Sequence, residues 1–277
     1  MEILNAMFRN KKYVANKKGR KVTDKYDVIE LHEHKSVIIA VCRNHGGFPI
    51  IRKIYIWDKA TEKALDYGNV QSYDKMDNGM FVLKVDGEFV LYDDNGEYIR
   101  RDITYYLKCN GTDLYIIKIE DKYYFATTEF NILAGPFLSA KEFDHYGYAT
   151  VQKDNEYFTL LTKELKEVFD VIQCEELKAL SKDFFLIRKN GKYGVIDKEK
   201  REIIPALYDR IQCKGNNHFE LVYNRKFGLA DIKGNIIFEC LYDEIMETPD
   251  KFVVKDFARL EINKSIEINK ECNCNTK

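Results

Sequence analysis

The sequence lacks the features that mark membrane-spanning, secreted and many catalytic proteins. No apolar run approaches the ~18 residues of a membrane-spanning helix, and residues 1–9 lack the basic region and apolar core of a secretion signal. The phosphate-binding pattern G-x-x-x-x-G-K-[ST] and the zinc-protease pattern H-E-x-x-H are both absent. These absences predict a cytoplasmic, non-enzymatic protein that uses no cofactor and no metal.

An excess of charge of one sign is also lacking. The 277-residue chain has 44 Lys and Arg against 45 Asp and Glu, so its net charge of −1 gives no global attraction to nucleic acid or to an anionic membrane. Proline is scarce (four residues), whereas 19 Tyr and 17 Phe favour strands rich in aromatic residues. The seven cysteines are scattered and odd in number, which predicts free thiols in a reducing compartment.

An aromatic residue recurs along the chain at a nearly constant spacing. The successive offsets are 34, 34, 34, 36 and 34 residues. A fixed offset of this size is the signature of a repeat array, in which one supersecondary unit is copied along the chain. We interpret these aromatic residues as structural repeat positions: Tyr55, Phe89, Tyr123, Tyr157, Tyr193 and Phe227.

Two-residue turn signals keep the same register as the aromatic residues. Asn-Gly and Asp-Gly between apolar runs indicate hairpins with type I′ turns, because both central residues of such a turn need positive φ. The flanking runs, such as 80–85 and 184–189, have strand-like lengths and are rich in β-branched and aromatic residues. The predicted turns are Asp86-Gly87, Glu120-Asp121, Asp154-Asn155, Asn190-Gly191 and Asn224-Arg225.

An aromatic residue followed by Asp is the second landmark of the unit. Tyr208-Asp209 and Tyr242-Asp243 are 34 residues apart. The repeated Asp residues either line up as a row of cation-binding carboxylates or close turns by accepting backbone N–H groups; their recurrence beside differing neighbours favours the turns. Further copies of the pair are Tyr26-Asp27, Tyr73-Asp74, Phe143-Asp144 and Phe169-Asp170.

The pattern predicts an all-β fold of tandem β-hairpin repeats with a period of about 34 residues, stacked as a solenoid-like or partly closed propeller-like array. No linker rich in Pro, Gly or Ser divides the chain, so we expect one domain over 1–277, with the array at about 12–260 and a tail at 261–277. A helical array of tetratricopeptide type shares the 34-residue period and is the alternative. Segments 163–173 and 175–181 are candidates for helical turns that cause the 36-residue step.

One unit resembles a known family. Gly191-Lys192-Tyr193-Gly194-Val195-Ile196-Asp197, followed by Ile203-Ile204-Pro205-Ala206-Leu207-Tyr208-Asp209, is similar to the WG (KWG) β-repeat of many bacterial proteins. Tyr193 and Phe227 stand where that family has Trp, and Gly194 and Gly228 match its Gly. The resemblance covers about 184–246 and is degenerate elsewhere. It implies a β-rich repeat fold and transfers no catalytic residue.

Three groups of residues have both a functional and a structural interpretation. The recurring aromatics form either a platform on which bases stack or, as we favour, the core between successive hairpins. His32 and His34 share one face of an extended strand, as in some metal sites, but a solvated pair is the favoured interpretation. Cys272 and Cys274 are two thiols near the end of the chain, with Cys240 too distant in sequence to suggest a complete zinc site.

A run of seven basic residues without an acid lies between residues 9 and 21. Such a run can contact phosphates or a partner, although Lys residues also protect an exposed sheet edge from aggregation. The candidate contact residues are Arg9, Lys11, Lys12, Lys17, Lys18, Arg20 and Lys21.

The leading functional hypothesis is a non-enzymatic protein-interaction module that presents a rigid β-repeat surface to another protein. Its narrower form is an inhibitor or adaptor of a larger microbial protein complex. The alternative is a nucleic-acid or nucleotide-binding protein that uses the basic first hairpin and exposed aromatic residues. No membrane partner is expected.

Overall fold

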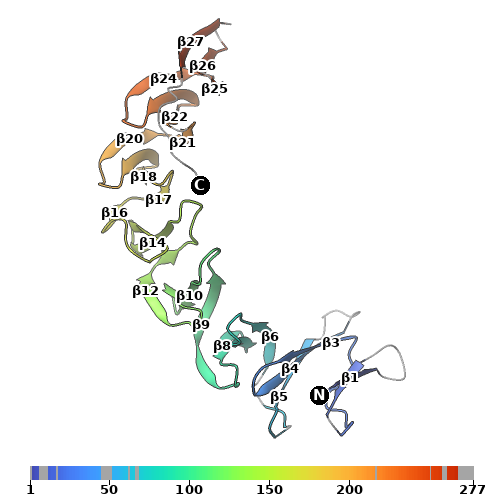
Figure 1. Ribbon diagram of the computed structural model, residues 1–277. Helices are drawn as coiled ribbons and strands as arrows, with labels where there is room; N and C mark the ends of the chain where they lie inside the picture. Colours follow the sequence, from blue (N-terminus) through green and yellow to red (C-terminus); the bar gives the residue numbers. More distant parts are fainter. Residues whose placement is uncertain are drawn as a thin grey trace. The chain divides into compact units, whose positions relative to one another are not determined.

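The computed structural model describes residues 2–5, 12–16, 18–44, 52–61, 63–65, 69–215, 217–249, 251–257 and 261–267 (Figure 1). Its contacts divide the chain into two compact units, Met1–Gly135 (unit 1) and Pro136–Lys277 (unit 2), which we describe separately. The single repeat domain expected from the sequence stays a prediction.

The predicted all-β fold is confirmed, because the regular elements of the described residues are 27 strands. Segments 163–173 and 175–181 contain the strands β16 and β17, so the expected helical turns are wrong. Among the described residues there is no helix of the length and apolarity that a membrane span requires.

Unit 1 contains three antiparallel sheets. The eleven-residue strand β9 pairs through its first half with β8 and through its second half with β10, and it thereby merges two repeats into one sheet. The first two sheets are formed by β1 (Glu2–Asn5) with β2 (Lys12–Ala15), and by β3 (Val28–Glu33), β4 (Val37–Arg43) and β5 (Arg52–Asp58). The third, seven-stranded sheet contains β6 (Val70–Lys75), β7 (Phe81–Val85), β8 (Glu88–Tyr92), β9 (Tyr98–Lys108), β10 (Tyr115–Ile119), β11 (Lys122–Ala126) and β12 (Ile132–Phe137).

Unit 2 contains four antiparallel sheets in chain order, and in each sheet the strands are neighbours in sequence. The first sheet is β13 (Ser139–Ala140), β14 (Ala149–Asp154), β15 (Tyr157–Leu161) and β16 (Ile172–Gln173). The second is β17 (Glu176–Ala179), β18 (Phe184–Lys189), β19 (Lys192–Asp197) and β20 (Glu202–Tyr208). The third is β21 (Arg210–Lys214), β22 (His218–Tyr223), β23 (Lys226–Asp231) and β24 (Ile236–Tyr242). The last is β25 (Glu244–Glu247), β26 (Lys251–Asp256) and β27 (Glu261–Glu267), with β27 at one edge.

The turn dipeptides form the central hairpins of the sheets. Both central residues have positive φ in Asp86-Gly87 (49° and 92°) and in Asn190-Gly191 (52° and 73°), as a type I′ turn requires. Asn224-Arg225 adopts the same conformation without glycine (48° and 63°). The prediction at Asp154-Asn155 is wrong by one residue. Asp154 pairs with Tyr157 after a shift of register, and the positive φ of 63° falls at Glu156.

The hydrophobic core lies between successive sheets. Its main repeating position is on the strand that leads into each hairpin turn. One core cluster joins Leu186 and Val195 of the second sheet of unit 2 to Phe219 and Leu221 of the third. This arrangement stabilises each sheet through its neighbour, as in other repeat proteins. The equivalent side chains recur 33 to 36 residues apart and are at most 2% exposed: Leu83, Ile117, Val151, Ile187, Leu221 and Val254.

The aromatic repeat positions lie at the edge of this core. Tyr55, Phe89, Tyr193 and Phe227 are half-buried and pack against core clusters, whereas Tyr157 is 39% exposed. The expectation that these rings are the core itself is therefore wrong for Tyr157 and only partly right for the others. The apolar runs that precede the turns supply the deeper core.

The Gly that follows the aromatic residue is required by a close approach of two strands. The last strand of the sheet is bulged opposite Gly194, between the pairs Tyr193–Tyr208 and Val195–Ile204. A Cβ on Gly194 would lie 2.8 Å from the backbone N of Ala206. Gly228 meets the same constraint, with the carbonyl oxygen of Phe238 at 2.7 Å. The β-repeat pattern therefore keeps Gly here for steric reasons.

We expect Leu221→Ala to lower the free energy of unfolding by about 2–5 kcal/mol, because it empties a fully buried site between two sheets. Phe227→Ala removes a larger but half-buried ring and should cost less. Tyr223→Ala, on the same strand as Leu221 and 44% exposed, is the control. Urea unfolding curves of the three variants measure the order, and a larger loss for Phe227→Ala would contradict this assignment of the core.

Candidate functional site

A carboxylate in the linker between sheets binds both of the sheets that it separates. The Oδ2 atom of Asp209 accepts a hydrogen bond from the backbone N–H of Asn224 in the next hairpin turn (2.7 Å). Its Oδ1 atom accepts from the Nζ of Lys192, at the start of β19. Asp243 repeats the arrangement with the N–H of Phe257 (2.9 Å) and the Nζ of Lys226 (2.6 Å). In both repeats the Lys precedes its Asp by 17 residues.

These contacts favour the charged form of the carboxylates. The hydrogen bond from Lys192, followed by that from the N–H of Asn224, lowers the pKa of Asp209. Lys226 and the N–H of Phe257 lower the pKa of Asp243 in the same way. Asp144 also accepts backbone N–H groups, from Tyr146 and Tyr148. The turn-closing interpretation thus describes these three Asp residues, and no three His, Cys, Asp or Glu side chains in the described ranges gather to hold a metal ion.

The 36-residue step changes this junction in unit 2. Glu156 stands 36 residues before Lys192, and Gln173 stands 36 residues before Asp209. The Nε2 of Gln173 donates to Glu156 (3.4 Å), so an amide–carboxylate pair replaces the Lys–Asp pair. Glu175, two residues further on, accepts the N–H of Gly191 (3.1 Å). Asp209 both pairs with a side chain of the preceding sheet and accepts a turn N–H. At the altered junction Gln173 makes the first contact and Glu175 makes the second.

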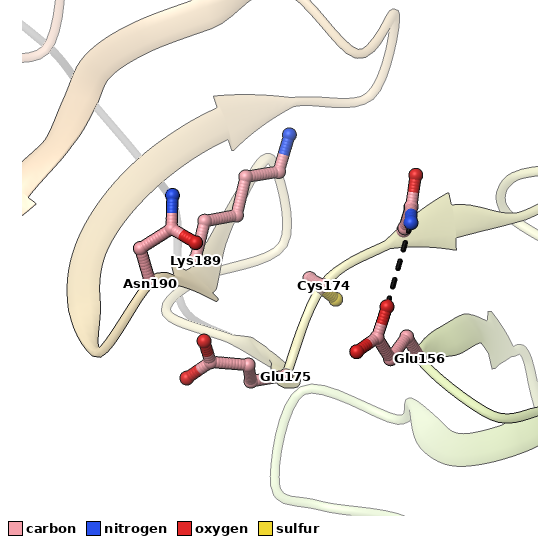
Figure 2. A pocket seen from close by; sticks show the side chains of 6 residues that line it. Glu156, Cys174, Glu175, Lys189 and Asn190 are labelled. Atoms are coloured by element: carbon pink, nitrogen blue, oxygen red, sulfur yellow. Dashed lines mark hydrogen bonds between the residues drawn. The ribbon is translucent and has the colours of Figure 1, made fainter.

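A pocket of about 230 Å³ lies at this altered junction. Figure 2 shows Lys189 and Asn190 on one wall and Glu156 on the other, with Cys174 and Glu175 between them. Burial raises the pKa of the Cys174 thiol to about 11, so the thiol stays protonated and is a poor nucleophile at neutral pH. The pocket offers hydrogen-bonding groups of both charges but no activated nucleophile.

The two histidines do not form the solvated pair expected from the sequence. They share one face, as predicted, but His34 is only 3% exposed. Its Nδ1 lies 2.9 Å from the carbonyl oxygen of Gly79 and 3.0 Å from Oδ1 of Asp94, and its Nε2 lies 2.7 Å from the hydroxyl of Tyr73. Because both neighbours of Nδ1 are acceptors, Nδ1 carries a proton, and Nε2 shares a hydrogen bond with the hydroxyl of Tyr73. His34 therefore joins three turns and strands of unit 1 as a structural residue.

The basic run is only partly described. Lys18, Arg20 and Lys21 are exposed around the turn at Gly19, which has a φ of 71°, and Lys12 is half-buried in β2. These four basic side chains form no ion pair with the described residues. Arg9, Lys11 and Lys17 lie outside the described residues, as do Cys272 and Cys274.

Cationic side chains cover the recurring aromatic rings. The guanidinium carbon of Arg188 lies 5.6 Å from the ring centre of Tyr193, and that of Arg210 lies 5.9 Å from Phe227. Lys53, Lys84 and Lys118 lie over Tyr55, Phe89 and Tyr123 at 5.0 to 5.6 Å. The rings of Tyr55, Phe89, Tyr193 and Phe227 are thus held between the core and a cation. These faces are less open to stacking than a base-binding platform requires.

An exposed apolar row, which was not predicted from the sequence, lies along the last strands of the sheets in unit 2. Leu207 on β20 is 59% exposed and Leu241 on β24 is 65% exposed, and Val171, just before β16, is 37% exposed. The three residues stand 36 and 34 apart. Each β20 or β24 strand has a hydrogen-bonded neighbour on one side only, and Figure 1 shows β16, β20 and β24 along one side of unit 2. We call Val171, Leu207 and Leu241 the outer row. In the sequence, the Leu that directly precedes Tyr208-Asp209 and Tyr242-Asp243 is the signal that could have revealed this row.

The sheets define a tandem β-repeat protein with four-stranded antiparallel units. Residues 193–213 and 227–263 match the model of the family described as WG containing repeat, so the resemblance is confirmed over these two segments. A comparison with curated protein sequences gives no match.

Several solved structures are similar to the chain at low sequence identity. The Kluyveromyces lactis Hsv2p structure is 8% identical, with 68% of this chain and 71% of that chain covered and a TM-score of 0.34. A crystal structure of the eukaryotic initiation factor is 11% identical, with 94% and 84% covered and a TM-score of 0.36. The Neurospora crassa Pan2 WD40 domain is 9% identical, with 82% and 85% covered and a TM-score of 0.31.

The linker carboxylates predict a specific dependence of stability on pH. Their pKa values are lowered in the folded protein, so their contribution is present above the ordinary Asp pKa of about 4 and is lost as the pH falls through the lowered values. The double variant Asp209→Asn with Asp243→Asn should therefore show a smaller acid-induced loss of stability. Asp170→Asn, which changes an exposed carboxyl, is the control. Urea unfolding at a series of pH values from neutral downward measures the slope, and an unchanged slope in the double variant would contradict the assigned role.

Proposed function

We propose that the protein is a non-enzymatic interaction module and that a partner protein docks on the outer row of unit 2. The observation that carries this proposal is the recurrence of an exposed apolar side chain at Val171, Leu207 and Leu241, which lie on, or directly before, the last strands of successive sheets. Single exposed apolar residues are normal on a protein surface, but a regular row of them marks an interaction site.

The scaffold behind the row is suited to docking. Tyr208 and Ile204 on β20 pack into the core cluster that joins the second and third sheets, and Phe238 and Tyr242 on β24 pack into the next one. Because these neighbours are fixed, Leu207 and Leu241 are presented with little backbone entropy left to lose on binding. Full burial of a Leu side chain contributes roughly 1.5–3 kcal/mol. Two or three such side chains supply a useful part of the affinity of a specific complex.

The narrower role that we propose is that of an inhibitor or adaptor within a larger microbial protein complex. A rigid module whose residues bind only through surface contacts acts by occupying its partner's surface or by holding two partners together. The protonated Cys174 and the hydrogen-bonded His34 support a non-enzymatic role, because neither is prepared for nucleophilic or acid–base chemistry.

The outer row can be tested by changing its apolar side chains to polar, uncharged ones. Leu207→Gln with Leu241→Gln should abolish the capture of the partner from native lysate by the immobilised protein, because two apolar contacts are lost while the sheets stay folded. The control is Tyr98→Gln, which changes a 62% exposed side chain of unit 1. Mass spectrometry identifies the captured protein. Equal capture by the double variant would refute the outer row as the docking site. The absence of any stable partner of the wild type would refute the proposal that the protein is an interaction module.

Exposure of Lys18, Arg20 and Lys21 around one turn favours nucleic-acid binding as a second candidate function. Replacing the three residues with Glu should then abolish a salt-sensitive shift of labelled RNA or DNA at low ionic strength. Failure of the wild type to bind either nucleic acid under those conditions removes this candidate and leaves the outer row unaffected.

A further inference from the structure

The strands that carry the outer row are acidic as well as apolar. Strands β16, β20 and β24 contain no Lys or Arg. Their charged residues are Glu202 on β20 and Glu239 on β24, and both are exposed. Neither carboxylate forms an ion pair with the described residues, although many other acidic side chains of unit 2 do, as in Asp209 with Lys192. The acidic character is local, since the whole chain has a net charge of only −1.

The geometry of β24 places charge and apolar surface together. Glu239 and Leu241 are both exposed, whereas Phe238, Cys240 and Tyr242 between and beside them are not, so the side chains of Glu239 and Leu241 project from the same face of the strand. A partner that covers Leu241 therefore also removes water from Glu239. Removing water from a carboxylate without a counter-ion costs several kcal/mol, which would cancel the gain from burying the Leu. A partner that presents acidic groups there adds repulsion to this cost.

Cations of the chain itself limit the acidic area to β20 and β24. The Nζ of Lys200 donates to the carbonyl oxygen of Val171 (3.4 Å) and brings positive charge to that end of the row. At the other end Lys226 pairs with Asp243. Glu239 thus accompanies Leu241, and Glu202 begins the strand that carries Leu207, five residues before it. Arg201, directly before Glu202, is paired with Asp197 and Glu199.

Docking by addition of a strand does not suit this edge. Pro205 on β20 has no N–H to donate to a new strand, and β20 and β24 both shift register against their neighbours. Pro and bulges are devices that protect edge strands from pairing. The partner therefore reaches the outer row through its side chains.

We infer that the occupant of the outer row is a basic segment of a partner protein, in which Leu or Ile stands two residues from Lys or Arg, so that both side chains project from one face. Its apolar side chains cover Leu207 and Leu241, and its cations pair with Glu202 and Glu239. This inference rests on the proposed docking function and adds the chemistry of the partner to it.

The test uses two fluorescein-labelled peptides. One carries Leu and Lys in turn at every second position, with Ser between them, and the other has Glu at every Lys position. Fluorescence anisotropy with the full chain should show binding of the Lys peptide, weakened by added salt, and no binding of the Glu peptide. Charge reversal by Glu202→Lys with Glu239→Lys should weaken binding of the Lys peptide by about tenfold or more, because attraction becomes repulsion.

A matched control separates local from global charge. Glu33→Lys with Asp121→Lys makes the same change of net charge on exposed residues of unit 1 and should leave the binding of the Lys peptide unchanged. Equal weakening by both pairs of substitutions, or equal binding of the two peptides, would overturn the inference.

The variant Leu207→Gln with Leu241→Gln distinguishes this inference from the function on which it rests. Loss of binding in that variant, with full binding after Glu202→Lys and Glu239→Lys, would keep the outer row as a docking site and overturn the basic partner. Full binding in the Leu variant would overturn the docking site itself.

Discussion

The hydrogen bond between a linker side chain and a turn N–H of the following hairpin is the contact on which the repeat depends. In Asp209 one oxygen binds the next turn at Asn224 and the other binds Lys192 of the preceding sheet. A sheet of four short strands cannot bury both of its faces, so it needs a neighbour held at a fixed register. The linker carboxylate supplies that register, and the shared clusters of apolar side chains then supply most of the stability.

The altered junction shows which part of this contact is essential. Glu175 keeps the bond to the turn, at Gly191, although no Lys–Asp pair is present there. In unit 1 the neutral side chain of Gln71 binds the N–H of Gly87 (3.0 Å) in the same way. An acceptor for the turn N–H is therefore the constant element, because a hairpin turn of this type leaves that donor unpaired. The lysine is an addition in the two most regular repeats.

The sequence predicted the period, the all-β class and most of the hairpins, because these depend on local signals. Asn190-Gly191 and Asp86-Gly87 adopt positive φ whatever surrounds them, and Gly194 marks a close approach that no other residue fits. Burial was harder to predict. Tyr157 and Phe227 are large and periodic, yet the deep core belongs to side chains of the preceding strand, such as Phe219 and Leu221, because that strand faces the neighbouring sheet.

The outer row and the buried His34 escaped prediction for a related reason. Leu207 and Leu241 look like core residues in sequence, and only the bulged course of the last strands turns them outward. His34 is polar and was expected in solvent, but its partners Gly79 and Asp94 stand 45 and 60 residues away. Contacts between strands that are distant in sequence decide both outcomes, and no local pattern contains them.

Amide hydrogen exchange at the turn residues Asn224 and Phe257 tests most directly whether linker carboxylates hold successive sheets together. These two N–H groups belong to turns, where exchange is ordinarily fast, but each donates to a carboxylate of the preceding linker. Slow exchange is expected at both amides in the wild type, and fast exchange at Asn224 alone after Asp209→Ala. Fast exchange at both amides in the wild type would contradict this role of the linker carboxylates.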